Sequence, residues 1–101
     1  MAKPVTKINS VHLTVQFIKH KDGIIAYAPS LDVSTIGKTL AKSQHMIGEA
    51  IRIFFDDLIE RGKLTEVLTS LGWVQRRSVW NPPRMIKEKL ISLKLPALVT
   101  I

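Results

Sequence analysis

Carboxylates are the first side chains in this sequence that suggest chemistry, because several of them converging can hold two metal ions for phosphodiester hydrolysis. The first predicted strand, VHLTVQF at residues 11–17, has none. Three acidic residues fall on the polar side of a predicted helix, where solvation explains them. The sequence therefore argues against a metal-dependent nuclease. The carboxylates considered for that role are Asp32, Glu49, Asp56, Asp57 and Glu60.

Histidine and serine give no stronger case for catalysis. His12, His20 and His45 have no cysteine to join them, and no two of them are four residues apart, the spacing that places two metal ligands on one helix face. No serine lies in a nucleophile elbow, and no glycine-rich phosphate loop occurs. We predict a protein that is not an enzyme, with no catalytic residue, no metal site and no cofactor.

Basic side chains are concentrated toward the C-terminal end. Residues 1–60 hold 7 Lys plus Arg against 6 Asp plus Glu, a charge of +1, and residues 61–101 hold 8 against 2, a charge of +6, in a total of +7. Trp73 and Trp80 flank two arginines, and interleaved aromatic and guanidinium groups can stack on bases and neutralise phosphates. A solubilising surface explains the same charges, so both interpretations stay open. The candidate nucleic-acid-binding residues are Arg76, Arg77, Arg84, Lys87 and Lys89, with Lys94 in the same cluster.

Three strands are predicted ahead of the first helix. Residues 11–17 alternate apolar and polar side chains, as in a half-buried strand that places Phe17 on its apolar face. Asp22-Gly23 favours a tight hairpin turn into the β-rich IIAYA segment. Pro29 ends that second strand, and LDVSTIG then runs back as a third strand near an edge.

Two helices follow in the predicted order. Thr39 is the expected N-cap of the first, after a chain reversal at Gly37. Gly62 is expected to end it, and KLTEVLTSLGW predicts a short second helix closed by Gly72. Trp73 is expected to pack beneath the sheet. The apolar stripe of the first helix consists of Ile47, Ile51, Phe54, Leu58 and, nearer its border, Phe55.

The C-terminal pattern is weaker. Asn81–Pro83 cannot lie inside a regular element. RMIKEKLISL at residues 84–93 is expected to form one or two helical turns. LPALVTI at 95–101 predicts a short edge strand that two subunits could exchange. With 101 residues and 46% hydrophobic content, one small domain is the default. We predict an α+β core domain over residues 1–73 and a basic extension over residues 74–101.

An ordered series of segments resembles the HicB family of antitoxins from bacterial toxin-antitoxin systems. The series is YAPSLDVSTIGKT, then Glu49-Ala50 within the first helix, then RGKLTEVLTSLGW. The resemblance covers residues 11–73 and fades afterwards, although the Trp80–Pro83 step is similar to shorter members. It implies an α+β fold in which an antiparallel sheet of three to four strands carries one main helix across one face, a partial RNase H-like arrangement. It also implies an antitoxin that binds and neutralises a HicA-type mRNA-cleaving toxin.

The resemblance bears on partners as well. Many members repress their own operon through an added C-terminal DNA-binding domain. Only 29 residues (101 minus 72) follow Gly72, which leaves little room for such a module and argues against autoregulation. Operator DNA is kept as a possible partner. AKSQHM also lacks the acidic first turn that the family tends to have. Tyr27, Pro29 and Asp32 are the candidate toxin-binding residues, because a carboxylate beside a sheet edge can pair with a cationic toxin. Leu31 between them is expected in the core.

Composition also bears on location and assembly. The chain has no cysteine, and no apolar run long enough for a signal peptide or a membrane span. We therefore expect a cytoplasmic protein without a membrane partner. Exposed strand edges predict a homodimer or higher oligomer, since an unpaired edge tends to find a partner.

Overall fold

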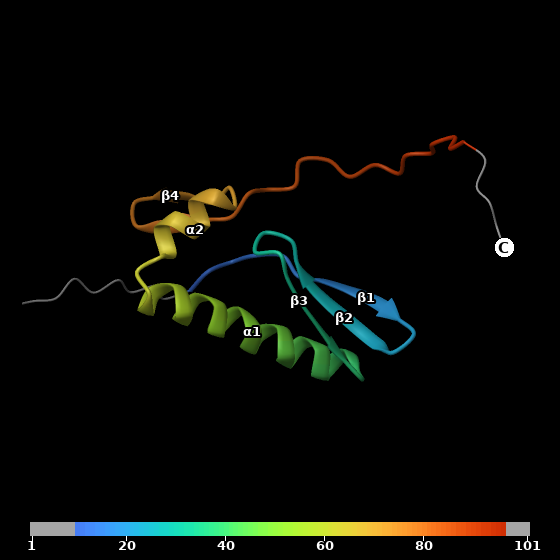
Figure 1. Cartoon of the computed structure of the whole chain (residues 1–101), viewed down its shortest axis with the longest axis horizontal. Coiled ribbons are helices and arrows are strands. Elements are labelled where there is room, and N and C mark those ends of the chain that lie inside the picture. Colours follow the sequence, from blue (N-terminus) through green and yellow to red (C-terminus); the bar gives the residue numbers. More distant parts are fainter. Residues whose placement is uncertain (1–9, 97–101) are drawn as a thin grey trace, which may run out of the picture.

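The computed structural model describes residues 10–96 and has the predicted α+β architecture, with a three-stranded antiparallel sheet and one main helix (Figure 1). The strands of the main sheet lie in the order β1-β2-β3, and β4 and β5 form a separate two-stranded sheet. Within the described part of the chain, no helix has the length and apolar character needed to cross a membrane. The elements are β1 (Gln16–His20), β2 (Gly23–Ala28), β3 (Val33–Gly37), α1 (Leu40–Glu60), α2 (Leu64–Ser70), β4 (Val74–Arg76) and β5 (Val79–Asn81).

The first strand begins later than the alternating pattern predicts. Residues 11–15 do alternate between partly buried and exposed, and Val11 and Leu13 pack against the core, but this segment is not in the sheet. Pairing with β2 starts only at Gln16. Alternation reports burial rather than hydrogen bonding, so an unpaired segment satisfies it equally well. Phe17, predicted on the buried face, is 38% exposed because β1 lies at the edge of the sheet, beyond the strands on which α1 packs.

Small residues bring α1 close to the sheet. Ala26 and Ala28 are fully buried on the helix-covered face, and Ser43 of α1 is fully buried as well. A Cβ atom added to Gly37 would lie 2.6 Å from the backbone nitrogen of Ser43. The φ of Gly37 is not positive, so this glycine provides space for the helix rather than the predicted chain reversal.

The predicted ends of α1 are confirmed. The Thr39 hydroxyl accepts a hydrogen bond from the Lys42 backbone N–H at 3.1 Å, as an N-cap does. At the other end Gly62 has a φ of +66°, and the Lys63 N–H reaches back to the Leu58 carbonyl at 2.8 Å. This is the Schellman arrangement, which favours glycine at the left-handed position. The same arrangement closes α2 at Gly72.

The core lies where α1, α2 and the β4–β5 hairpin meet the β2–β3 loop. Trp73 is 2% exposed and packs edge-on against Phe55, with ring centroids 6.0 Å apart. Its indole Nε1 donates a hydrogen bond to the Ser30 carbonyl at 2.9 Å, which ties the loop to the segment after α2. The predicted burial of Trp73 and Leu31 is therefore confirmed. The buried cluster consists of Leu31, Phe55, Leu58, Leu64, Leu68, Trp73 and Trp80.

The region after Trp73 differs from its prediction. The sequence did not predict the β4–β5 hairpin, whose two-residue turn at Arg77 and Ser78 has φ values of +52° and +66°. Such a turn usually carries Asn-Gly, and that signal is absent here. Trp80 of β5 joins the buried cluster, so the core packing continues past residue 73.

The predicted helical turns at residues 84–93 are wrong. Residues 82–95 contain neither helix nor strand, and Figure 1 shows them running away from the domain above the sheet. A helix this short is marginal without a surface to pack against. Most of the predicted last strand, residues 97–101, lies outside the described residues.

Candidate functional site

The β2–β3 loop carries the three candidate toxin-binding residues. The Leu31 N–H donates to the Ala28 carbonyl at 3.1 Å, and the Asp32 N–H donates to the Pro29 carbonyl at 3.3 Å. These turns direct Leu31 into the core and leave Pro29 and Asp32 exposed. Asp32 has a φ of +56°, a conformation that aspartate tolerates better than most residues.

Tyr27 and Asp32 contact each other directly. The Tyr27 hydroxyl donates a hydrogen bond to the Asp32 Oδ1 at 3.0 Å. This bond raises the pKa of Tyr27 above 10.0, with smaller contributions from burial and from the negative charge of Asp32. The phenol thus holds an exposed carboxylate at a defined place beside the sheet. Both residues were selected as candidates from the sequence, but their bond depends on the left-handed backbone at Asp32, which no sequence pattern predicted.

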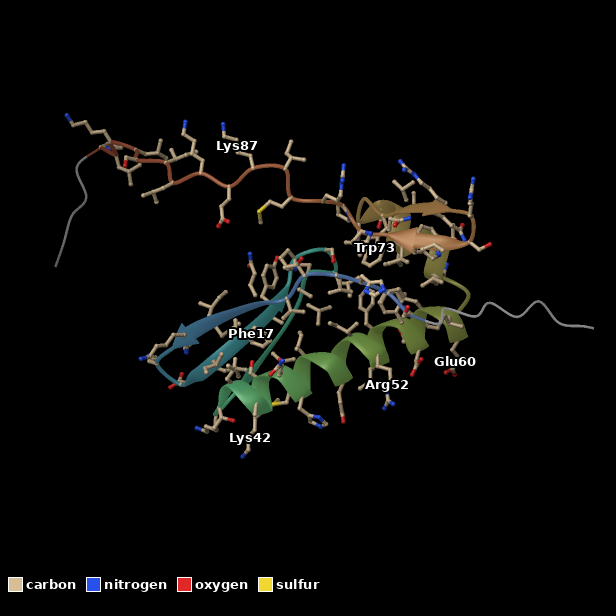
Figure 2. All side chains as sticks on the ribbon, turned by 180° about the vertical axis from the view of Figure 1, so that it is seen from behind. Phe17, Lys42, Arg52, Glu60, Trp73 and Lys87 are labelled. Carbon is tan, nitrogen blue, oxygen red and sulfur yellow. The ribbon has the colours of Figure 1, made fainter. Side chains whose placement is uncertain are left out.

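Pro29 lies in a hollow between the loop and the chain that follows β5. The hollow has a volume of about 560 Å³ and is lined by residues 12–14, Gln16, Pro29, Ser30 and residues 82–85. Arg84 is among the lining residues, so one of the predicted nucleic-acid-binding side chains lies beside the predicted toxin-binding loop. Lys87 projects from the chain beyond this hollow, away from the domain (Figure 2).

An apolar row crosses the face of the sheet opposite α1. Ile18 pairs with Ile25, and Ile25 pairs with Ile36, so the three side chains lie in register across β1, β2 and β3. Ile18 is 46% exposed and Ile36 41%. Tyr27 lies on the same face, two residues from Ile25 along β2. We call Ile18, Ile25, Ile36 and Tyr27 the open face.

Sequence reasoning did not single out the open face. The alternation within β2 did indicate this face, since Ile25 and Tyr27 are two residues apart and therefore point away from the face that buries Ala26 and Ala28. Apolar groups bordered by polar ones are typical of protein-binding surfaces. The open face therefore extends the candidate site from the loop onto the sheet.

The basic candidates are exposed, but the alternative in which Trp73 and Trp80 stack on bases does not fit the structure. Trp73 and Trp80 are 2% and 7% exposed, because both are needed to fill the core, and neither is available to stack on bases. Within residues 10–96, none of the basic candidates forms an ion pair. The exposed candidates are Arg76, Arg77, Arg84, Lys87 and Lys89.

Two ion pairs on the helix α1 lie apart from this site. His45 lies 3.3 Å from Glu49, and Arg61 lies 3.3 Å from Asp57, both on the exposed surface of α1. No group of three or more His, Asp or Glu residues in the described part of the chain is arranged to hold a metal ion. Comparison with protein-family models, curated proteins and solved structures finds no match to this chain.

The Tyr27–Asp32 bond predicts a measurable titration. Because the folded pKa lies above the ordinary value of 10.0, the stabilisation is complete below that pH and is lost as pH rises through the folded pKa. Absorbance of the phenolate reports this directly, since the chain has 1 tyrosine. We expect a midpoint above 10.0 that falls in Asp32→Asn and stays unchanged in the control Asp22→Asn. Equal midpoints in Asp32→Asn and the parent chain would show that the bond is absent in solution.

Proposed function

We propose that this protein is an antitoxin that binds a HicA-type mRNA-cleaving toxin and neutralises it by covering its active surface. The HicB resemblance supports this proposal, as does the presence of a sheet, loop and helix in the order that the resemblance implies. The antitoxin contributes shape and a few charges and makes or breaks no covalent bond. Repression of its own operon would be a second activity of the same protein.

The observation that carries the proposal is the exposed carboxylate of Asp32, held by Tyr27 beside the open face. A fixed carboxylate next to apolar side chains suits a cationic protein partner, because the charge sets the register and the apolar area supplies affinity. The net charge of +7 would repel a basic toxin at long range, but the excess of +6 lies in residues 61–101. The half of the chain that carries the loop has a charge of only +1, so a local carboxylate can dominate there.

Co-expression tests this function. The tagged chain is produced together with a HicA-type toxin, taken from the neighbouring reading frame if that frame encodes a small basic protein, and growth and co-purification are followed. We expect growth arrest by the partner to be relieved and the two proteins to elute as one complex. Unchanged growth arrest, with the tagged chain present in excess, would refute the proposal.

The exposed basic residues support a second candidate function, binding of nucleic acid. Arg84, Lys87 and Lys89 lie on one extended segment that offers cations to phosphates along its length. We rank this candidate second because the tryptophans are buried and large apolar side chains interrupt the cations. This function is tested by measuring nucleic-acid affinity at increasing salt concentration, since binding through several phosphates weakens by orders of magnitude as ionic strength rises. Absence of binding to duplex DNA or RNA at low salt would remove it.

A further inference from the structure

The segment Met85–Leu95, which we call the arm, exposes large apolar side chains to water. Ile86 is 92% exposed and Leu90 94%, nearly the full area of an isolated side chain. Figures 1 and 2 both show the arm standing clear of the sheet and of α1. Monomeric proteins rarely expose apolar groups in such a continuous run, and those that do usually bind something there. The apolar side chains of the arm are Met85, Ile86, Leu90, Ile91, Leu93 and Leu95.

A hollow on the helix-covered side of β1 is open to solvent in the described part of the chain. α1 packs on β3 and β2 and leaves Phe17 of β1 38% exposed and Leu40 of α1 51% exposed. Figure 2 shows Phe17 on the side of the sheet that faces α1. These two side chains help to line a hollow of about 880 Å³, which we call the β1 hollow. Its lining consists of Phe17, all of residues 19–24, Lys38 and Leu40.

The outer edge of β1 is also unpaired. The sheet order is β1-β2-β3, so β1 bonds on one side only. Within residues 10–96, no backbone hydrogen bond joins its outer edge to another segment. An edge strand of this kind is a template for a further strand. A strand added there would also lie directly beside the β1 hollow.

The last part of the arm fits this edge in length and pattern. Residues 91–95 read Ile-Ser-Leu-Lys-Leu, which alternates apolar and polar side chains and matches the five residues of β1. In an added strand, alternate side chains point to opposite faces of the sheet. Ile91, Leu93 and Leu95 would then enter the β1 hollow while Lys94 points to the opposite face. The sheet would therefore separate Lys94 from Lys19, which lines the hollow.

We propose that the arm of one copy of this chain pairs with the outer edge of β1 in a second copy and fills its β1 hollow. A second copy is the occupant because within one chain the arm stands clear while the hollow stays open. Reciprocal exchange about a two-fold axis fills both hollows with both arms and leaves no further site, so assembly stops at the dimer. Tyr27 and Asp32 lie at the other end of β2 from this hollow, so the dimer keeps the candidate toxin-binding loop accessible. The dimer does not depend on the proposed function.

Light scattering of the full chain and its variants tests the exchange. We expect a mass of about twice 11.4 kDa for the parent chain and about 11.4 kDa for the double variant Ile91→Lys, Leu93→Lys. Both positions are exposed within one chain, so this variant should keep the parent's circular dichroism spectrum, while its unfolding temperature should fall because the dimer contact is lost. The control is Ser92→Lys, which adds one lysine on the other face of the arm and should remain a dimer.

Mixing variants separates exchange between chains from closure within one chain. Phe17→Lys damages the hollow but keeps an intact arm, and the double arm variant keeps an intact hollow. Exchange predicts that each variant alone is monomeric and that their mixture forms a heterodimer through one remaining contact. A monomeric parent chain would mean that the arm closes on its own domain or stays free, and dimers in all variants would mean another interface. Either result would overturn the proposal.

Discussion

If the chain binds a toxin as proposed, we expect Asp32→Lys to weaken that binding by about two orders of magnitude. Loss of one partner in a charge pair at an interface costs about 2 to 5 kcal/mol, and each tenfold change in affinity corresponds to about 1.4 kcal/mol. The substitution removes the carboxylate that Tyr27 holds at 3.0 Å and places a cation against a cationic partner. Isothermal titration with the purified toxin measures the change. Tyr27→Phe removes only the hydrogen bond that positions the carboxylate, so its effect should be smaller, at about tenfold.

Asp22 provides the matched control for Asp32. Both are exposed carboxylates in turns at the two ends of β2, and neither is in the core. Asp22→Lys changes the net charge of the chain by the same amount as Asp32→Lys. If both variants lose equal affinity, the effect comes from net charge alone and the β2–β3 loop is not the contact. A loss of affinity confined to Asp32→Lys would support the β2–β3 loop as the toxin contact.

Replacing Trp73 with alanine will lower the free energy of unfolding by about 3 to 5 kcal/mol, the usual cost of truncating a buried tryptophan. The side chain is 2% exposed, packs against Phe55 and holds the Ser30 carbonyl at 2.9 Å. Domains of this size are stable by about 5 to 15 kcal/mol, so this loss is a large share of the total. Urea unfolding followed by circular dichroism measures the loss.

Two further variants divide the Trp73 effect into parts. Trp73→Phe keeps a ring but leaves the Ser30 carbonyl without its donor, and we expect a cost of about 1 to 3 kcal/mol from that unsatisfied group, beyond any loss from the smaller ring. Val74→Ala changes the neighbouring residue, which is 50% exposed, and should alter stability by less than about 0.5 kcal/mol. A Trp73→Ala variant as stable as Val74→Ala would show that the loop is not tied to the core in this way.

Local signals in the sequence predicted much of the fold. Thr39 and Gly62 mark the two ends of α1, as predicted, because capping depends on a few neighbouring atoms that these residue types supply. The apolar stripe that includes Ile47 and Leu58 is buried because helical spacing sets which side chains share a face. Tyr27 and Asp32 were each selected from the sequence as candidate toxin-binding residues, and only the folded loop shows that they bond to each other.

The remaining features depend on contacts between distant segments. Phe17 fits an alternating pattern, yet its exposure is decided by which strands α1 covers. The turn at Arg77 and Ser78 lacks the residue types that usually form such a turn. The hairpin forms nevertheless, because it buries Trp80 in a core made by segments distant in the sequence. The sequence predicted the burial of Trp73 but left base stacking open for both tryptophans, since spacing along the chain does not show which way the ring of Trp80 points.

The central claim is that this protein neutralises a toxin by occupying its surface without chemistry of its own. The most direct measurement is cleavage of a labelled RNA by the purified toxin as the full chain is added in increasing amounts. We expect cleavage to fall in proportion to the added chain, to stop once every toxin molecule is bound, and to be absent with the chain alone. Cleavage that continues with the chain in large excess, or that the chain performs unaided, would contradict the account.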